Sequence, residues 1–140
     1  MASNTKGLLK MNDKVKYWLD LCDEDLITAK ALLEKKRLLH MGYFCHMVME
    51  KSLKAAVTSE TGNTPPKIHS LPKLAELSNV WDRLSTEQKD LIKTLIPLQI
   101  EARYPEFKDQ IAASLTFDLC TQILLETEEF LCWIKQLLEK

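Results

Sequence analysis

Apolar side chains recur every three or four positions along most of this chain of 140 residues. Between residues 14 and 37 the stripe consists of Val15, Trp18, Cys22, Leu26, Ala29 and Leu33. Such spacing places all of its members on one face of an α-helix. The sequence contains only 3 glycines and 5 prolines, so few turns interrupt the helical pattern. We therefore expect an all-α fold, an up-and-down bundle of four or five helices with short connections.

Residues that cap or break helices locate the expected boundaries. Gly62 favours the left-handed backbone that ends a helix, and Ser85 with Gln88 has the spacing of a capping box. Pro97 lies inside an apolar stripe, where it should kink the helix because it removes a backbone hydrogen bond. The predicted helices cover approximately residues 14–37, 40–60, 70–78, 85–105 and 109–138.

The second predicted helix is apolar on nearly every side between Met41 and Met49. A helix of that kind is usually the most buried one of a bundle. His46, Glu50 and Lys54 follow one another at steps of four, so they share one face of this helix. Buried polar groups need partners or a cleft. The alternative is a solvated stripe that holds one weak ion pair.

The charge balance argues against bulk binding to nucleic acid or to a membrane surface. The formal net charge is −1, with 46% hydrophobic and 28% charged residues, as in an ordinary globular domain. Bulk binding to nucleic acid or membrane usually needs a basic excess, so only a local basic patch is compatible with this composition. Residues 1–12 are polar and lack the apolar core of a signal peptide. We expect them to form a disordered lead before a single domain over residues 13–140.

The cysteines do not form a metal-binding pattern. The four are Cys22, Cys45, Cys120 and Cys132. All fall in predicted helices, and the short ligand spacings of a zinc site are missing. We expect buried, reduced thiols, no bound metal, no cofactor and a cytoplasmic location, where thiols stay reduced.

Two further features fall outside the core pattern. His69 follows Pro65-Pro66 and precedes a predicted helix, where it would either fix the path of the loop or contact a ligand. Arg103 and Tyr104 precede Pro105 at the predicted end of the fourth helix. An Arg is favoured there by the helix dipole. It is equally suited to bind phosphate, with the neighbouring ring stacking on a base.

Several short motifs follow one another in a characteristic order. They are Tyr-Phe-Cys-His-Met-Val-Met-Glu-Lys-Ser-Leu-Lys-Ala at 43–55, Gly62, Pro65-Pro66, His69-Ser70-Leu71, Leu74 and Glu-Ala-Arg-Tyr-Pro at 101–105. This series resembles the HEPN (higher eukaryote and prokaryote nucleotide-binding) domain family. The resemblance covers residues 15–140. It implies a helical bundle that self-associates and binds a nucleotide or RNA. It also implies a minimal nucleotidyltransferase as partner, in a toxin–antitoxin pair.

The ribonuclease branch of that family uses an Arg followed, after four to six residues, by a His. Arg103 matches the Arg of this motif, but the corresponding positions for the His hold Lys108, Asp109 and Gln110. Without that His there is no obvious general base to activate a ribose hydroxyl. The sequence therefore favours a domain that binds without catalysing.

Three functions are compatible with the sequence. The first is a non-catalytic, dimeric nucleotide- or RNA-binding module that would act as the partner of a minimal nucleotidyltransferase. The second is a metal-independent ribonuclease that uses His69 or His46 as acid or base. The third is an oligomerisation bundle without a ligand. The predicted ligand-binding residues are Glu50, Lys51, Lys54, His69, Arg103 and Tyr104.

Overall fold

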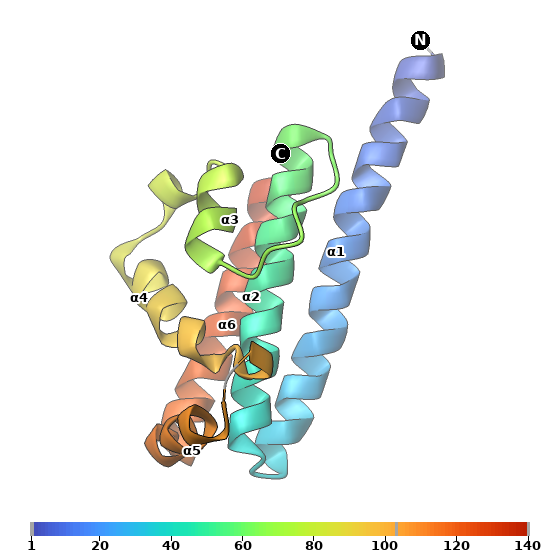
Figure 1. Ribbon diagram of the computed structural model, residues 1–140. Coiled ribbons are helices and arrows are strands. Elements are labelled where there is room, and N and C mark those ends of the chain that lie inside the picture. The colour runs from blue at the N-terminus through green and yellow to red at the C-terminus, as the bar shows by residue number, and fades with distance from the viewer. Residues whose placement is uncertain (1, 103, 140) are drawn as a thin grey trace.

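A computed structural model describes the backbone of residues 2–102 and 104–139, and the side chains of residues 13–101 and 104–139. Over the described residues the chain forms six α-helices and three short 3-10 helices (Figure 1). The α-helices are α1 (Ala2–Glu34), α2 (Leu38–Thr61), α3 (Leu71–Leu77), α4 (Thr86–Leu95), α5 (Pro105–Ser114) and α6 (Phe117–Leu138). The 3-10 helices are η1 (Trp81–Arg83), η2 (Ile96–Leu98) and η3 (Ile100–Ala102).

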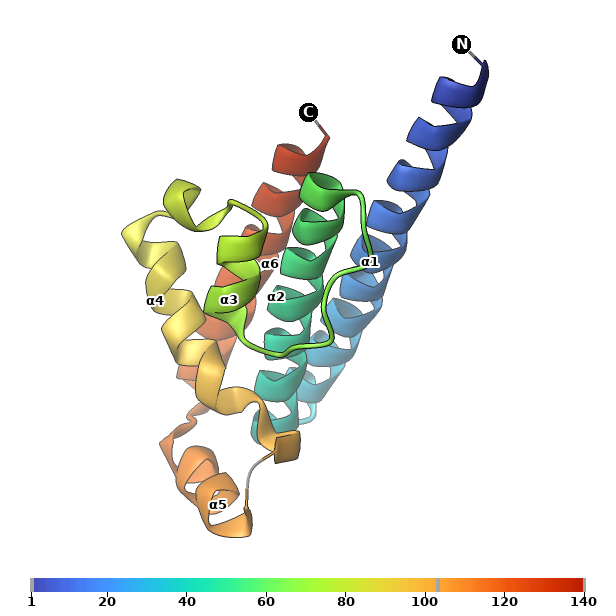
Figure 2. The same ribbon diagram turned by 45° about the horizontal axis from the view of Figure 1, so that its top comes forward.

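The long helices α1, α2 and α6 stand side by side, with α3 and α4 against one side of α2 and α6 (Figures 1 and 2). Four of these helices alternate in direction along the chain: α1 descends in Figure 1, α2 ascends, α4 descends and α6 ascends. Ion pairs between Lys30 and Glu128 and between Lys135 and Asp23 join α1 to α6 in antiparallel order. This arrangement confirms the predicted all-α bundle.

Helix α2 is the most buried element, as its sequence predicts. Its buried side chains face α1, α3, α4 and α6, which is possible because the helix is apolar on nearly all sides. At Gly42 a side chain would begin 3.0 Å from Leu98 Cδ1. The lack of a Cβ at this position therefore allows η2 to lie directly against α2.

The caps predicted at Gly62 and at Ser85 with Gln88 are confirmed. Gly62 ends α2 with φ 72°, in the left-handed region that only glycine enters freely. The structure shows a further cap at the start of α3, where the Ser70 hydroxyl accepts a hydrogen bond from the amide of Lys73. Ser85 and Gln88 form both hydrogen bonds of a capping box at the start of α4.

Two predicted helices are divided in the structure. Helix α4 ends at Leu95, and η2 and η3 follow it, so Pro97 ends the α-helix instead of kinking it. Pro105 does not merely terminate a helix but begins α5, because the first turn needs no amide donor. The predicted helix 109–138 is interrupted before Thr116, whose hydroxyl accepts a hydrogen bond from the amide of Leu119 and caps α6.

Two other expectations need correction. Helix α1 begins at Ala2, so the segment expected to be a disordered lead has helical backbone. Extending an existing helix costs little, and no proline interrupts this segment. The thiols of Cys22, Cys45 and Cys120 are buried and free, whereas Cys132 is exposed on α6. Because Cys132 lies off the apolar stripe of that helix, it is not covered by the core.

Candidate ligand-binding site

A buried carboxylate on α2 lies at the centre of the site. Glu50 is only 1% exposed. Its Oε2 atom accepts a hydrogen bond from Lys54 Nζ at 3.0 Å, and its Oε1 atom lies 3.1 Å from His69 Nδ1. On the other side His46 Nδ1 is 3.7 Å from Oε1. The stripe of His46, Glu50 and Lys54 is therefore a buried polar cluster and not a solvated one.

This cluster compensates for the burial of a charge. A carboxylate that leaves water is destabilised by several kcal/mol unless cations and donors surround it. Lys54, whose side chain is 10% exposed, supplies the cation. His69 supplies a further donor from the surface, since 63% of its side chain is exposed.

The loop between α2 and α3 places His69 over Glu50. It starts at the left-handed Gly62 and runs back along α2 on the side of α1 before it crosses to α3 (Figures 1 and 2). Pro65 is buried, and the Pro66 carbonyl accepts a hydrogen bond from the amide of Ile68 at 2.9 Å. His69 therefore fixes the loop to α2, the first role considered from the sequence, and its other ring edge faces solvent.

Helix α1 closes the site from its other side. The ammonium of Lys54 lies 5.6 Å from the centre of the Trp18 ring, within reach of a cation–π interaction. Lys51 Nζ is 2.7 Å from a carboxylate oxygen of Asp25, and both side chains are largely covered. Each of the two lysines predicted to hold phosphate is thus already paired with a carboxylate.

The side chain of Glu101 approaches the same face of α2. Tyr43 lies two helical turns before Glu50. Burial raises the pKa of the Tyr43 phenol, and a hydrogen bond with the Glu101 carboxylate raises it further. The predicted ligand residue Arg103 lies outside the described residues, and Tyr104 is 72% exposed.

The structure therefore brings together three of the six predicted site residues, Glu50, Lys54 and His69. Sequence reasoning did not assign Tyr43 or Trp18 to the site. Tyr43 had a detectable signal, because it lies seven positions before Glu50 and so on the same face of the helix. Trp18 had none, since its spacing is that of an ordinary core residue.

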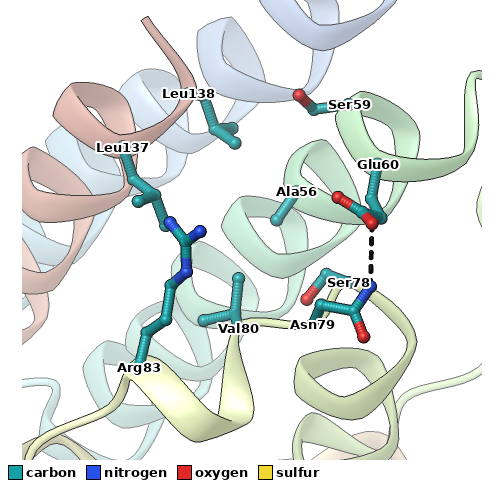
Figure 3. A pocket seen from close by; sticks show the side chains of 9 residues that line it. All are labelled: Ala56, Ser59, Glu60, Ser78, Asn79, Val80, Arg83, Leu137 and Leu138. Carbon is teal, nitrogen blue, oxygen red and sulfur yellow. Dashed lines mark hydrogen bonds between the residues drawn. The ribbon is translucent and has the colours of Figure 1, made fainter. Parts of the chain in front are cut away.

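A hollow of about 250 Å³ lies at the other side of α2, near its C-terminal end (Figure 3). Asn79 donates a hydrogen bond to Glu60 Oε1 at 2.8 Å on one wall. The Arg83 guanidinium extends from η1 toward Leu137 on the opposite wall (Figure 3). Arg83 forms no ion pair with any described residue, which makes it a useful control for the charges around Glu50.

The described side chains offer no group of three His, Cys, Asp or Glu residues arranged to hold a metal ion. Within the same part of the chain, every helix is too short or too polar to cross a membrane.

Comparison with protein families places the chain in a known one. The HEPN domain model matches residues 15–137, which is nearly the whole chain. No curated protein and no solved structure shows a significant match. The matched region contains α2, the loop with His69 and the segment of Glu101 to Pro105, the parts that carry the motifs described above. The chain therefore belongs to the HEPN domain family.

Proposed function

We propose that this HEPN domain binds the phosphate groups of a nucleotide or of RNA on the surface around His69, and that it does so without catalysing a reaction. The observation that carries this proposal is the hydrogen bond between the buried Glu50 carboxylate and the exposed His69 ring. Because Nδ1 lies against Glu50, Nε2 faces solvent, where it can donate a hydrogen bond when the ring carries both of its protons. Such an oriented cationic donor suits a phosphate oxygen.

Lys54 has a supporting part in this proposal. Its ammonium is shared between Glu50 and the Trp18 ring, and its side chain is 10% exposed. It therefore neutralises Glu50, so that an incoming anion does not meet an uncompensated carboxylate. Lys51 is held by Asp25 in the same way. Free positive charge comes from the exposed loop residue Lys67, which forms no ion pair with a described residue, and we predict a further contribution from Arg103 with stacking on Tyr104.

Binding measurements on matched variants test the proposal. We expect His69→Ala to weaken binding of ATP and of single-stranded RNA by about tenfold or more, since a charge-assisted hydrogen bond contributes about 1.5–3 kcal/mol. Arg103→Ala should weaken binding similarly. Arg83→Ala removes an exposed cation from the hollow in Figure 3 and should leave affinity unchanged. Unchanged affinity in His69→Ala, with a cooperative thermal melt, would rule out this site.

Cleavage of RNA is a second candidate function that the same hydrogen bond favours. A carboxylate that holds one ring nitrogen of a His orients the other nitrogen as a general base. In that case the neutral His69 would accept the proton of a ribose 2′-hydroxyl at Nε2. Metal-independent cleavage of single-stranded RNA that is lost in His69→Ala would establish the ribonuclease. Intact RNA after incubation with the wild type would support binding alone.

We further propose that a second copy of the chain docks on the surface formed by η2, α5 and α6. A hollow of about 260 Å³ lies there, lined by apolar side chains of Leu98, Ile111, Leu115 and Leu119 among others. Phe107 on α5 and Phe117 on α6 are exposed. An exposed apolar surface of this kind usually marks an interface.

The solution mass tests this docking. We expect a dimer that Leu119→Glu converts to a monomer, because the charge would lie in the apolar hollow. A monomeric wild type would contradict the proposal. Co-purification with a minimal nucleotidyltransferase, the toxin–antitoxin partner implied by the resemblance, is the corresponding test for a heterologous complex.

A further inference from the structure

A hollow of about 460 Å³ opens between the first described side chains of α1 and the C-terminal end of α2. Its lining residues are Asp13, Lys14, Tyr17, Trp18, Thr58 and Thr64. Two of these residues are aromatic: Tyr17 and Trp18 lie edge to face, with ring centroids 5.6 Å apart. Tyr17 is 59% exposed, although a tyrosine ring is largely apolar. The hollow therefore offers stacking surface that no described side chain covers.

Thr58 is a second, independent sign that a ligand binds here. The residue is buried, and its hydroxyl oxygen has no hydrogen-bond partner among the described residues. A buried hydroxyl without a partner is uncommon and destabilising. Threonine in a helix divides between two χ1 rotamers. Rotation of this side chain would thus offer the unused hydroxyl to a group bound in the hollow.

The hollow adjoins the proposed phosphate site. Trp18 lines it and at the same time receives the ammonium of Lys54, the partner of Glu50. Thr58 follows Glu50 by eight positions on α2, a rise of about 12 Å. The loop that carries His69 also supplies Thr64 to the hollow. A base in the hollow and a phosphate at His69 would therefore lie within the length of one nucleoside polyphosphate or two linked nucleotides.

We propose that this hollow is the nucleobase pocket of the domain. The base stacks on the exposed Tyr17 ring beside Trp18, and its polar edge bonds to the Thr58 hydroxyl. The charged groups of Asp13 and Lys14, neither of which is ion-paired to a described residue, face the remaining polar atoms of the base. This inference rests on the proposed function, since His69 and its neighbours hold the phosphates. It assigns a direction to the ligand, from the base near Thr58 to the phosphates near Glu50.

Comparison of ATP with inorganic tripolyphosphate separates the pocket from the phosphate site. We expect the wild type to bind ATP about tenfold more tightly than tripolyphosphate, since stacking of one base typically contributes that much or more. Tyr17→Ala should lower ATP affinity toward that of tripolyphosphate and leave tripolyphosphate binding unchanged. Thr58→Val, which keeps the shape and removes the hydroxyl, should weaken ATP binding several-fold. Ile27→Ala is the matched control, because it removes an exposed apolar side chain of α1 that does not line the hollow.

Fluorescence provides a readout at the pocket itself. In a chain with Trp81→Phe and Trp133→Phe, Trp18 is the remaining tryptophan, and ATP should change its emission whereas tripolyphosphate should not. Equal affinity for the two ligands, or unchanged ATP affinity in Tyr17→Ala, would overturn the base pocket and leave the phosphate site standing. If the wild type binds neither ligand, both the pocket and the proposed function are wrong.

Discussion

His69 Nδ1 lies 3.1 Å from Glu50 Oε1, although the two residues are 19 positions apart in the sequence. Their surroundings differ strongly, because Glu50 is buried in α2 and the His69 side chain is 63% exposed. The contact therefore connects the interior of the bundle to its surface. It also ties the loop after α2 to the helix that it has just left, and thereby defines one wall of the proposed nucleotide site.

Loss of the Glu50 charge should destabilise the fold. Glu50→Gln keeps the shape of the side chain but leaves Lys54, which is 10% exposed, without its carboxylate. Removing one partner of a buried ion pair typically costs about 3–5 kcal/mol. We expect a loss of that size in the free energy of unfolding, measured in urea. Glu60→Gln changes an exposed carboxylate that is bonded to Asn79 and should cost less than about 1 kcal/mol.

The double variant Glu50→Leu/Lys54→Met tests whether the unpaired charge, and not a loss of packing, destabilises Glu50→Gln. Replacement of both partners by apolar side chains of similar size is often neutral or stabilising. We therefore expect the double variant to recover most of the stability that Glu50→Gln loses. Its nucleotide binding should be weaker than that of the wild type, because His69 loses the carboxylate that orients it. A double variant less stable than Glu50→Gln would contradict the view that the lone buried charge is the destabilising element.

Thiol labelling should distinguish one cysteine from the other three. Cys132 is exposed, whereas Cys22, Cys45 and Cys120 are buried and burial raises the pKa of each buried thiol. Since the thiolate is the reactive form, covered thiols react slowly. We expect one rapidly labelled thiol per folded chain at pH 8 and all four in urea. In Cys132→Ser the rapid phase should disappear; a rapid phase that persists would mean that a helix exposes its inner face.

The cap of α6 is a further test of the fold. The Thr116 hydroxyl accepts a hydrogen bond from the amide of Leu119, at the point where sequence periodicity predicted an uninterrupted helix. Thr116→Ala should lower the free energy of unfolding by about 1 kcal/mol, the usual cost of losing an N-cap. Thr121→Ala is the control, because that exposed hydroxyl bonds only to a carbonyl of its own helix. Equal effects of the two substitutions would show that α6 does not begin at Thr116.

Much of the bundle was predictable because local signals and burial agree there. Three signals depend only on nearby residues, and the structure confirms each of them. They are the capping box of Ser85 and Gln88, the left-handed Gly62 and the apolar surface all round α2. Prediction was wrong where two local signals compete. At Pro97 the apolar spacing continues, but the α-helix ends because proline has no amide to donate. At Thr116 the apolar spacing also continues, but the residue caps a new helix.

The site was only partly predictable, for a different reason. The step of four between Glu50 and Lys54 is a property of one helix, so the pair is visible in the sequence. The pairing of Lys51 with Asp25 and the contact of Lys54 with Trp18 depend on how α1 packs against α2. The spacing of residues within one helix does not determine which residues of α1 lie opposite which residues of α2.

Alkaline pH should weaken the fold in part through Cys45. Burial raises the pKa of its thiol from 9.0 to about 12. Above pH 9 the unfolded chain therefore releases this proton while the folded chain retains it. The contribution of Cys45 to stability is full below pH 9 and is lost as the pH rises toward 12, by at most about 1.4 kcal/mol per pH unit. In Cys45→Ala we expect a lower overall stability but a shallower decline between pH 9 and 10.5, measured by urea unfolding at each pH. Parallel declines in the two proteins would mean that the Cys45 thiol ionises as readily in the folded bundle as in the unfolded chain.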